Sequence, residues 1–135
     1  MPKILHPLLA REALPIASLG VCRLYLRNVS EFPWLLLVPM RDDIREIYDL
    51  TAEDYEQTMR EVRSVAKHLA EITGADKMNV ATLGNIVPQL HIHIIARFKT
   101  DPAWPNPVWN FAAPPTPYPA DKANALIGQL RTIIN

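Results

Sequence analysis

The sequence predicts an α+β fold: an antiparallel sheet of about five strands, with one long helix packed on it and a second helix at the C-terminal end. Three features support this prediction. Strand-forming runs lie on both sides of one long amphipathic segment, the run that contains two histidines alternates between apolar and polar residues, and apolar residues recur at helical spacing near the end. Strands before and after a single long helix are typical of an antiparallel sheet covered by that helix.

Two strands are expected before the long helix, joined as a hairpin. Residues 1–20 carry prolines among short apolar pieces, so we expect an irregular N-terminal arm with one helical turn around residues 8–12. Residues 21–29 alternate loosely and are rich in strand formers, and an apolar run at 34–38 ends at Pro39. The residues between these runs include Asn, Ser and Pro, which are typical of a turn.

The long helix is expected to begin after Thr51, a good N-cap, and two acidic residues follow in the first turn, where the helix dipole favours them. Gly74 suits the C-terminal end. One apolar stripe runs between them: Met59, Val62, Val65, Ala66, Leu69 and Ile72. Two more strands are expected after the helix, at residues 77–83 and 90–98, with a Gly-Asn break between them.

The C-terminal part combines a proline-rich segment with a helix. Residues 102–119 hold seven prolines in eighteen positions, together with Trp104 and Trp109. Tryptophan is unusual in flexible linkers, so we expect an ordered, extended arm whose indoles anchor it on a surface. Residues 120–135 form the expected C-terminal helix. At this length the chain, residues 1–135, is expected to be a single domain.

Composition and charge limit the possible partners. The chain has 14 basic and 14 acidic residues, so no overall field favours nucleic acid or an anionic membrane. Cys22 is the one cysteine, which excludes an internal disulfide framework and a multi-cysteine metal site. The apolar runs are too short to span a bilayer, and the first residues lack the pattern of a secretion signal. A cytoplasmic location is the simplest expectation.

The most informative run is PQLHIHII, residues 88–95. Side chains of a strand alternate between its two faces, so the apolar residues at 90, 92 and 94 point into a core. Gln89, His91 and His93 then point the other way, as a row of polar groups spaced about 7 Å apart. Imidazole is a nucleophile, a proton carrier near neutral pH and a metal ligand, so this row is the candidate site.

The stretch NVATLGNIVPQLHIHIIAR, residues 79–97, resembles the signature of the histidine-triad (HIT) superfamily. That signature is His-φ-His-φ-His-φ-φ, where φ is apolar, preceded by Gly-Gln-x-Val-x. The hairpin before the long helix, which ends in Val-Pro, is also similar to that of the family, so the resemblance extends over residues 22–97. The tail DPAWPNPVW, residues 101–109, resembles a bacterial branch described as Ap4A-hydrolase-like, where Ap4A is diadenosine tetraphosphate.

The resemblance implies a homodimer whose sheets join across a two-fold axis. It also implies hydrolysis or transfer at the α-phosphorus of a nucleotide or dinucleoside polyphosphate, through a covalent nucleotidyl-histidine. The middle triad position, the nucleophile, is His91, and the third position, on the phosphate and leaving-group side, is His93. The first position is Gln89, so the chain has a Gln-x-His-x-His variant of the triad. Glutamine can support the site by hydrogen bonding but carries no proton.

The resemblance also implies roles for residues outside the triad. Gly84 and Asn85 stand where Gly-Gln precedes the triad, and Asn85 can reach a phosphate oxygen. Ile86 stands where many members have Ser or Thr, so one phosphate donor is lost. Asn28 matches the residue that contacts the ribose. Trp34 replaces a further supporting histidine of many members, which marks a divergent branch.

Nucleophilic catalysis sets a requirement that does not depend on the family. The attacking imidazole must be neutral, with one ring nitrogen free and the other held as N–H, and a nearby backbone carbonyl is the usual device for this. His91 is then expected to attack phosphorus in line, and water to cleave the P–N bond. His93 and backbone N–H groups at the Gly-Asn break are expected to stabilise charge on the phosphate oxygens.

Three other interpretations remain open. A His-x-His pair can bind a metal, but it needs a third ligand, and the remaining histidines are His6 in the arm and His68 on the long helix. The pair can also be purely structural. The chain can also be a nucleotide-binding or adaptor protein without catalysis, in which Gln89 stands in place of the first histidine of the triad. Trp104 and Trp109 can shield a nucleotide base instead of anchoring the arm. No metal and no cofactor is expected.

Overall fold

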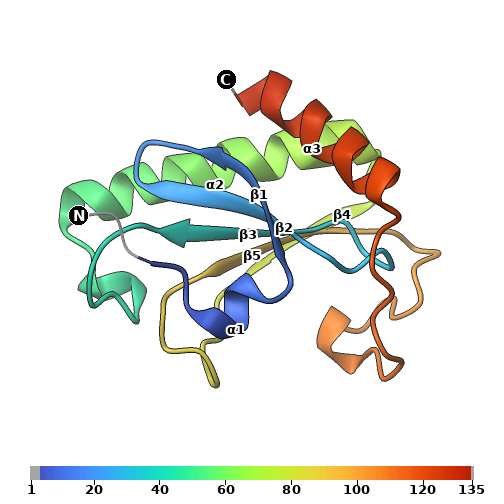
Figure 1. Ribbon diagram of the computed structural model, residues 1–135, viewed down its shortest axis with the longest axis horizontal. Helices are drawn as coiled ribbons and strands as arrows, with labels where there is room; N and C mark the ends of the chain where they lie inside the picture. The colour runs from blue at the N-terminus through green and yellow to red at the C-terminus, as the bar shows by residue number, and fades with distance from the viewer. Residues whose placement is uncertain (1–3, 135) are drawn as a thin grey trace.

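The computed structural model of the protein describes residues 4–134. Its centre is a five-stranded sheet in the order β1-β2-β3-β5-β4, in which every neighbouring pair is antiparallel (Figure 1). The strands are β1 (Ala13–Ser18), β2 (Cys22–Arg27), β3 (Trp34–Pro39), β4 (Lys77–Ala81) and β5 (Ile92–Arg97). The predicted α+β fold with an antiparallel sheet is therefore confirmed.

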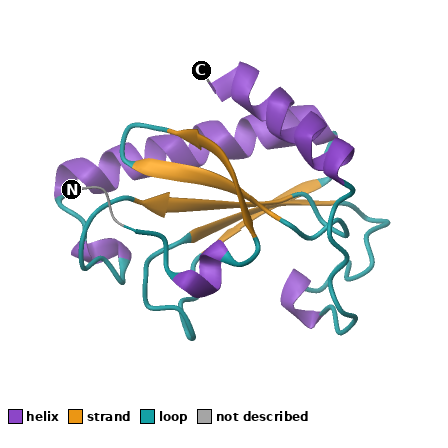
Figure 2. Ribbon diagram, in the orientation of Figure 1, coloured by secondary structure: helices purple, strands orange, loops and turns teal. Residues whose placement is uncertain are grey.

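Two helices cover one face of the sheet, α2 (Ala52–Thr73) and α3 (Ala120–Ile134) (Figure 2). The short helix α1 (Pro7–Ala10) and the single turn η2 (Val108–Asn110) lie on the other side. A further turn, η1 (Ile47–Asp49), precedes α2. None of the helices within residues 4–134 is long and apolar enough to cross a membrane.

Strands β3 and β5 are buried on both faces, because apolar clusters lie on each side of the sheet. On β3, Leu35 and Leu37 belong to the cluster beneath α2 and α3, whereas Trp34 and Leu36 belong to the cluster on the opposite face. On β5, Ile94 points to the helices and the next residue along the strand points away from them. This alternation follows the period of two that strands impose. It explains why β3 reads as a continuous apolar run.

Helix α2 matches its prediction closely. The Thr51 hydroxyl accepts a hydrogen bond from Asp54 N at 3.1 Å, and Gly74 ends the helix in the left-handed conformation at φ 67°. The helix also carries a buried carboxylate, Glu61. This carboxylate accepts from the backbone N–H groups of Val21 at 3.0 Å and Cys22 at 2.9 Å, so it ties α2 to the start of β2.

The expectation of an irregular N-terminal arm over residues 1–20 is wrong for residues 13–18. They form β1, the edge strand paired with β2 from Ala13↔Arg27 to Ser18↔Arg23, with an irregular register after Pro15. An edge strand tolerates proline, because one of its sides needs no hydrogen-bond partner within the sheet. The helical turn is α1, at 7–10 rather than 8–12.

The two strands after α2 are shorter than predicted. β4 ends at Ala81 instead of residue 83, and β5 begins at Ile92 instead of residue 90. Leu90 N donates to the carbonyl of Ile44 at 2.9 Å, outside the sheet. His91 therefore precedes the first residue of β5, and its side chain is positioned by the preceding loop as well as by the strand.

The proline-rich segment begins with turns rather than as the extended arm that we expected. The carboxylate of Asp101 accepts from the backbone N–H groups of Ala103 at 3.1 Å and Trp104 at 2.8 Å, which bends the chain. Buried Arg97 of β5 holds this turn. Its guanidinium donates to Asp101 at 2.8 Å and to the carbonyl of Asn106 at 2.7 Å. The segment is thus attached to the sheet before it reaches η2.

Replacing Arg97 with Ala should strongly destabilise the protein. Only 2% of the Arg97 side chain and 4% of the Asp101 side chain are exposed, so the substitution leaves a buried carboxylate without its cation. Breaking such a pair costs about 3–5 kcal/mol. Urea unfolding should show this loss, whereas Lys99→Ala, at an exposed position, should change stability by at most about 0.5 kcal/mol. A loss for Arg97→Ala below about 1 kcal/mol would contradict the role assigned to the pair.

Candidate active site

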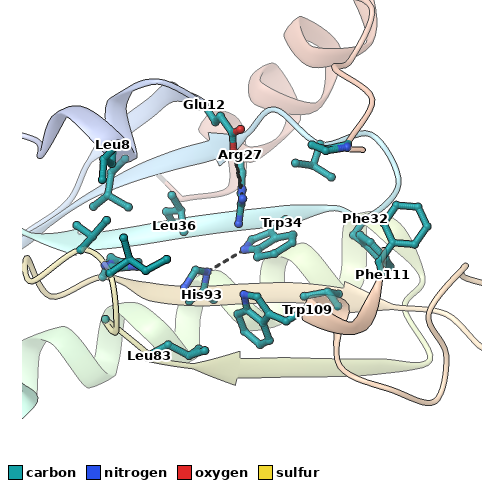
Figure 3. Close-up of a pocket in the computed structure, with 18 of the residues that line it drawn as sticks. Leu8, Glu12, Arg27, Phe32, Trp34, Leu36, Leu83, His93, Trp109 and Phe111 are labelled. Carbon is teal, nitrogen blue, oxygen red and sulfur yellow. Dashed lines mark hydrogen bonds and ion pairs between the residues drawn. The ribbon is translucent and has the colours of Figure 1, made fainter. Parts of the chain in front are cut away.

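A pocket of about 490 Å³ opens on the sheet face opposite α2 and α3 (Figure 3). Residues of α1, β2 and β3 form one side of it, and His91 and His93 line it next to them. The loop at 83–87 and the proline-rich segment at 108–115 complete the wall. Most lining side chains are apolar or aromatic, which is typical of a small-molecule site with a few polar groups.

The structure brings the two histidines of the PQLHIHII run together in this pocket. Their ring centroids lie 4.9 Å apart and their planes make an angle of 73°. His93 lies on β5 opposite Leu36 of β3 and Ala81 of β4. Only 6% of His91 and 5% of His93 is exposed. His91, just before β5, and His93, on β5, therefore turn their imidazoles to the same face, as predicted.

A backbone carbonyl defines the tautomer of His91. Its Nδ1 lies 2.7 Å from the carbonyl oxygen of Gln89. A carbonyl only accepts, so Nδ1 carries the proton and Nε2 keeps its lone pair. Burial lowers the pKa of His91, the Gln89 carbonyl opposes this, and the charge of nearby Arg27 adds to the lowering. His91 is thus held as a neutral imidazole with a free Nε2, which is the form a nucleophile requires.

His93 has the opposite tautomer. The indole Nε1 of Trp34 donates to His93 Nδ1 at 2.9 Å, shown by the dashed line in Figure 3. An indole N–H only donates, so His93 Nδ1 accepts and its proton is on Nε2. Burial lowers the pKa of His93 to about 3, with further lowering by the charges of His91 and Arg27. His93 is therefore a neutral hydrogen-bond donor at physiological pH.

Both Nε2 atoms are free to meet a ligand. Neither makes a hydrogen bond with residues 4–134, and neither is among the fully enclosed side-chain atoms of this part of the chain that have no partner. The pocket therefore presents one lone pair, from His91, and one N–H, from His93. No group of three or more His, Cys, Asp or Glu side chains suitable for a metal ion occurs within residues 4–134.

Arg27 is a pocket residue that the sequence reasoning missed. Its guanidinium lies 4.2 Å from the centre of the Trp34 ring and forms an ion pair with Glu12 at 3.1 Å. Both charged residues line the pocket. The alternation of β2 was a usable signal, because Leu24 and Leu26 face the helices and the residue after them must face the histidines.

Asn28, predicted to contact a ribose, lies outside the pocket lining. The strand ends at Arg27, and the Asn28 side-chain oxygen accepts from the backbone N–H of Tyr118 at 2.8 Å. It anchors the chain that leads into α3 instead. Its neighbour Arg27 lines the pocket, because the pleat turns alternate side chains to different sides.

The side chain of Gln89 also points away from the histidine pocket. Its Oε1 accepts from His6 N at 2.7 Å and its Nε2 donates to the carbonyl of Ile4 at 3.3 Å, beside a second cavity of about 590 Å³. Gln89 does support the site, but through its backbone carbonyl, which holds His91. The amide side chain ties the N-terminal segment to the start of the histidine run.

The other two predicted site residues, Gly84 and Asn85, do line the pocket. Gly84 has φ 69°, in the left-handed region, and an added Cβ would meet the carbonyl oxygen of Val87 at 3.4 Å. Glycine is therefore suited to this turn, which places loop backbone beside the histidines. Ile86, in the same loop, is 84% exposed.

The tryptophans of the proline-rich segment have different positions. Trp109 packs edge-on against His93 at 5.1 Å and against Trp34 at 5.7 Å, and it remains 43% exposed at the pocket. Trp104 lies under the Arg97 guanidinium, 5.8 Å from its ring centre. Phe111 packs against Phe32 at 5.6 Å. Trp104 thus belongs to the attachment of the segment, whereas Trp109 forms part of the pocket wall.

Comparisons with known proteins agree with this geometry. The HIT domain family model matches residues 15–100. A histidine triad protein from Bradyrhizobium japonicum is 41% identical, with all of both chains covered and a TM-score of 0.96. A histidine triad protein from Sinorhizobium meliloti is also 41% identical, with 97% of this chain and 96% of that chain covered and a TM-score of 0.94.

More distant structures share the fold alone. The diadenosine triphosphate hydrolase of Plasmodium falciparum is 16% identical, with 93% of this chain and 77% of that chain covered and a TM-score of 0.67. No curated protein sequence matches the chain significantly. The matched region contains most of β1, the other four strands, α2 and both pocket histidines, and on this ground the chain belongs to the HIT domain family.

Proposed function

We propose that the protein is a nucleotide phosphohydrolase that acts at the α-phosphate of a nucleotide or dinucleoside polyphosphate, through a covalent nucleotidyl-histidine at His91. One observation carries this proposal: the 2.7 Å contact between His91 Nδ1 and the Gln89 carbonyl, which leaves a neutral imidazole with a free Nε2 in the pocket. The family, which includes nucleotide hydrolases, and the similarity of the fold to a diadenosine triphosphate hydrolase support the same class.

The reaction proceeds in two displacements. His91 Nε2 attacks the α-phosphorus, a P–N bond forms, and the bond from phosphorus to the leaving group breaks with its electron pair on the leaving group. The ring becomes a cation, and its Nδ1–H bond to the Gln89 carbonyl strengthens as the charge develops. Water then attacks phosphorus and loses a proton to solvent, and the electron pair of the P–N bond returns to His91. Two moderate barriers replace one high barrier.

In this proposal, three groups stabilise charge on the phosphate oxygens. His93 offers its Nε2–H, Arg27 offers a guanidinium, and the turn at Gly84-Asn85 brings backbone and amide groups to the same wall. Removing one such donor commonly costs about 10²–10³ in rate. The aromatic side chains of Phe32, Trp109 and Phe111 are the surface on which we place the nucleotide base.

A second candidate is a nucleotide-binding protein with little or no catalysis. It is favoured by the side chain of Gln89, which is committed to the N-terminal segment, and by Ile86, which provides no phosphate donor. Tight binding of a nucleotide without turnover would establish this function.

In either case we propose a small nucleotide as the partner, rather than nucleic acid or a membrane, since the 14 basic and 14 acidic residues balance. A reducing cytoplasm suits the single, buried, free cysteine.

His91→Ala should abolish turnover of diadenosine tetraphosphate and the acid-labile nucleotidyl adduct, because no other group in the pocket has the same free lone pair. His93→Ala should lower kcat by about 10²–10³ while the adduct still forms. Rapid acid-free quenching and mass spectrometry detect the adduct. His68→Ala, on α2 and outside the pocket lining, is the matched histidine control and should react like the natural protein. Turnover that survives His91→Ala would contradict the mechanism.

The activity should persist to a lower pH than an ordinary histidine allows. Burial lowers the pKa of His91 below 6.5, so protonation removes the nucleophile only at more acidic pH. We expect kcat/KM to be level from about pH 8 to about pH 6.5 and to fall below that. Arg27→Gln removes a positive charge that helps to lower the pKa of His91, so the fall in kcat/KM of this variant should occur at a higher pH. A fall that begins above about pH 7 in the natural protein would contradict this environment.

We also propose that the protein is a homodimer whose sheets join at β4. This strand is at the edge of the sheet, and large apolar side chains are exposed on it and on the following loop, Val80 at 48%, Leu83 at 45% and Ile86 at 84%. An apolar sheet edge favours pairing with another strand. Light scattering should give twice the chain mass of 15.3 kDa. Val80→Lys should lower the measured mass toward that of the monomer. The control Gln129→Lys, on the exposed surface of α3, should leave the mass unchanged. A monomeric natural protein would refute the dimer.

A further inference from the structure

The hydrogen bond between Trp34 and His93 has a direct effect on the protonation of the pocket. Both side chains are buried, with 4% of Trp34 and 5% of His93 exposed. The indole Nε1 lies 2.9 Å from His93 Nδ1, and the ring centres are 5.6 Å apart. The two residues are on adjacent strands, since Trp34 pairs with Ile95 and Leu36 pairs with His93. The geometry is therefore set by the sheet itself.

This bond is incompatible with a doubly protonated His93. The indole nitrogen has an N–H and no acceptor lone pair. Protonation of His93 Nδ1 would place two N–H groups against each other and would leave a buried indole donor unsatisfied. As long as Trp34 keeps its place, His93 holds one proton, on Nε2, and that nitrogen faces the pocket.

The charges around His93 act in the same direction. Arg27 of β2 lies over the Trp34 ring, and the centre of the His91 ring is 4.9 Å from that of His93. The negative Glu12 is paired with Arg27 rather than with an imidazole. Trp109, which packs edge-on against His93, is uncharged. No acidic side chain among the described pocket residues therefore faces His93 to stabilise an imidazolium.

No other side chain in the pocket can supply a proton to a leaving group. The ionisable residues that line it within the described chain are Glu12, Arg27, His91 and His93. Glu12 accepts hydrogen bonds from Arg27, and His91 gives its Nδ1 proton to the Gln89 carbonyl. The first triad position is an amide, Gln89, and its side chain is turned to the N-terminal segment. The pocket thus has hydrogen-bond donors but no acid.

We propose that Trp34 is a positioning residue that fixes His93 as a neutral donor and so restricts the enzyme to nucleoside 5′-phosphoanhydrides, whose leaving group departs without a proton. This inference rests on the phosphohydrolase function proposed above. When His91 attacks such a substrate, the bond between the α-phosphorus and the bridging oxygen breaks, and the electron pair stays on the oxygen of the departing phosphate. That anion is stable, and His93 Nε2–H can donate a hydrogen bond to it without transferring the proton.

A nucleoside phosphoramidate makes a different demand. Its P–N bond breaks with the electron pair on an amine nitrogen, which is a very poor leaving group unless it takes up a proton in the same step. General acid catalysis of this kind commonly contributes about 10²–10⁴ in rate. A site without an acid should therefore hydrolyse the anhydride and react slowly with the phosphoramidate of the same nucleoside, although both offer the same α-phosphate to His91.

The test compares two substrates on three proteins. The natural protein should hydrolyse diadenosine tetraphosphate with a kcat/KM at least about 100 times that for adenosine 5′-phosphoramidate. Trp34→Gln removes the indole N–H, lets water reach His93 and supplies an amide oxygen that can accept from a protonated Nδ1, so His93 can bind a second proton. This ratio should then fall at least about tenfold, and further as the pH is lowered from about 7.5 to about 5.5. Trp109→Gln, the same change of the other tryptophan on this imidazole, should lower kcat/KM for both substrates alike, because Trp109 belongs to the surface assigned to the base, and should leave their ratio as it is.

Nitrogen NMR of ¹⁵N-histidine-labelled protein gives a readout that does not need activity. In the natural protein and in Trp109→Gln, the His93 Nδ1 signal should be that of an unprotonated nitrogen throughout this pH range, and in Trp34→Gln it should titrate. Equal rates for the two substrates in the natural protein, or a protonated Nδ1, would overturn the inference while hydrolysis through His91 stands. Failure of both substrates to form an adduct at His91 would refute the hydrolase, and the substrate restriction with it.

Discussion

The antiparallel pairing of β3 with β5 is the constraint on which the rest of the structure depends. It places Leu36 opposite His93 and brings the indole of Trp34 to hydrogen-bond distance of the same imidazole. Because both strands are central in the sheet, every second side chain packs beneath the helices and the others must fill the opposite face. A shift of this register by one residue would exchange the two faces and remove both imidazoles from the pocket.

The pocket controls its chemistry by controlling protons. Two imidazoles lie in contact, yet each has a partner that determines its tautomer: a carbonyl that only accepts for His91, and an indole that only donates for His93. Burial and the charge of Arg27 keep both rings neutral. Since unfolding exposes these rings to water, the unfolded chain takes up protons below about pH 6.5 that the folded protein excludes, and stability decreases as the pH falls through that range. Keeping both imidazoles neutral therefore makes the folded protein less stable at acidic pH.

Much of the fold could be predicted because its signals are local. Helix α2 has a cap, an apolar stripe and a terminal glycine within its own residues, and all three are present in the structure. β1 was missed because Pro15 is a poor strand former, and the strand exists only through its pairing with β2. Likewise Asn28 was assigned to the site and Arg27 was not, because the end of β2 and the bond to Tyr118 decide which of these neighbours faces the pocket.

The sequence by itself determined that two imidazoles share one face of a strand, because the period of two is a property of the extended backbone and needs no partner. It also determined the fold class and, through the histidine signature, the family. Only the tertiary structure decided which proton each imidazole carries, because Trp34 and the charge of Arg27 reach the pocket from other strands. Hydrogen-bond direction depends on groups distant in the chain, and these meet only when the sheet has formed.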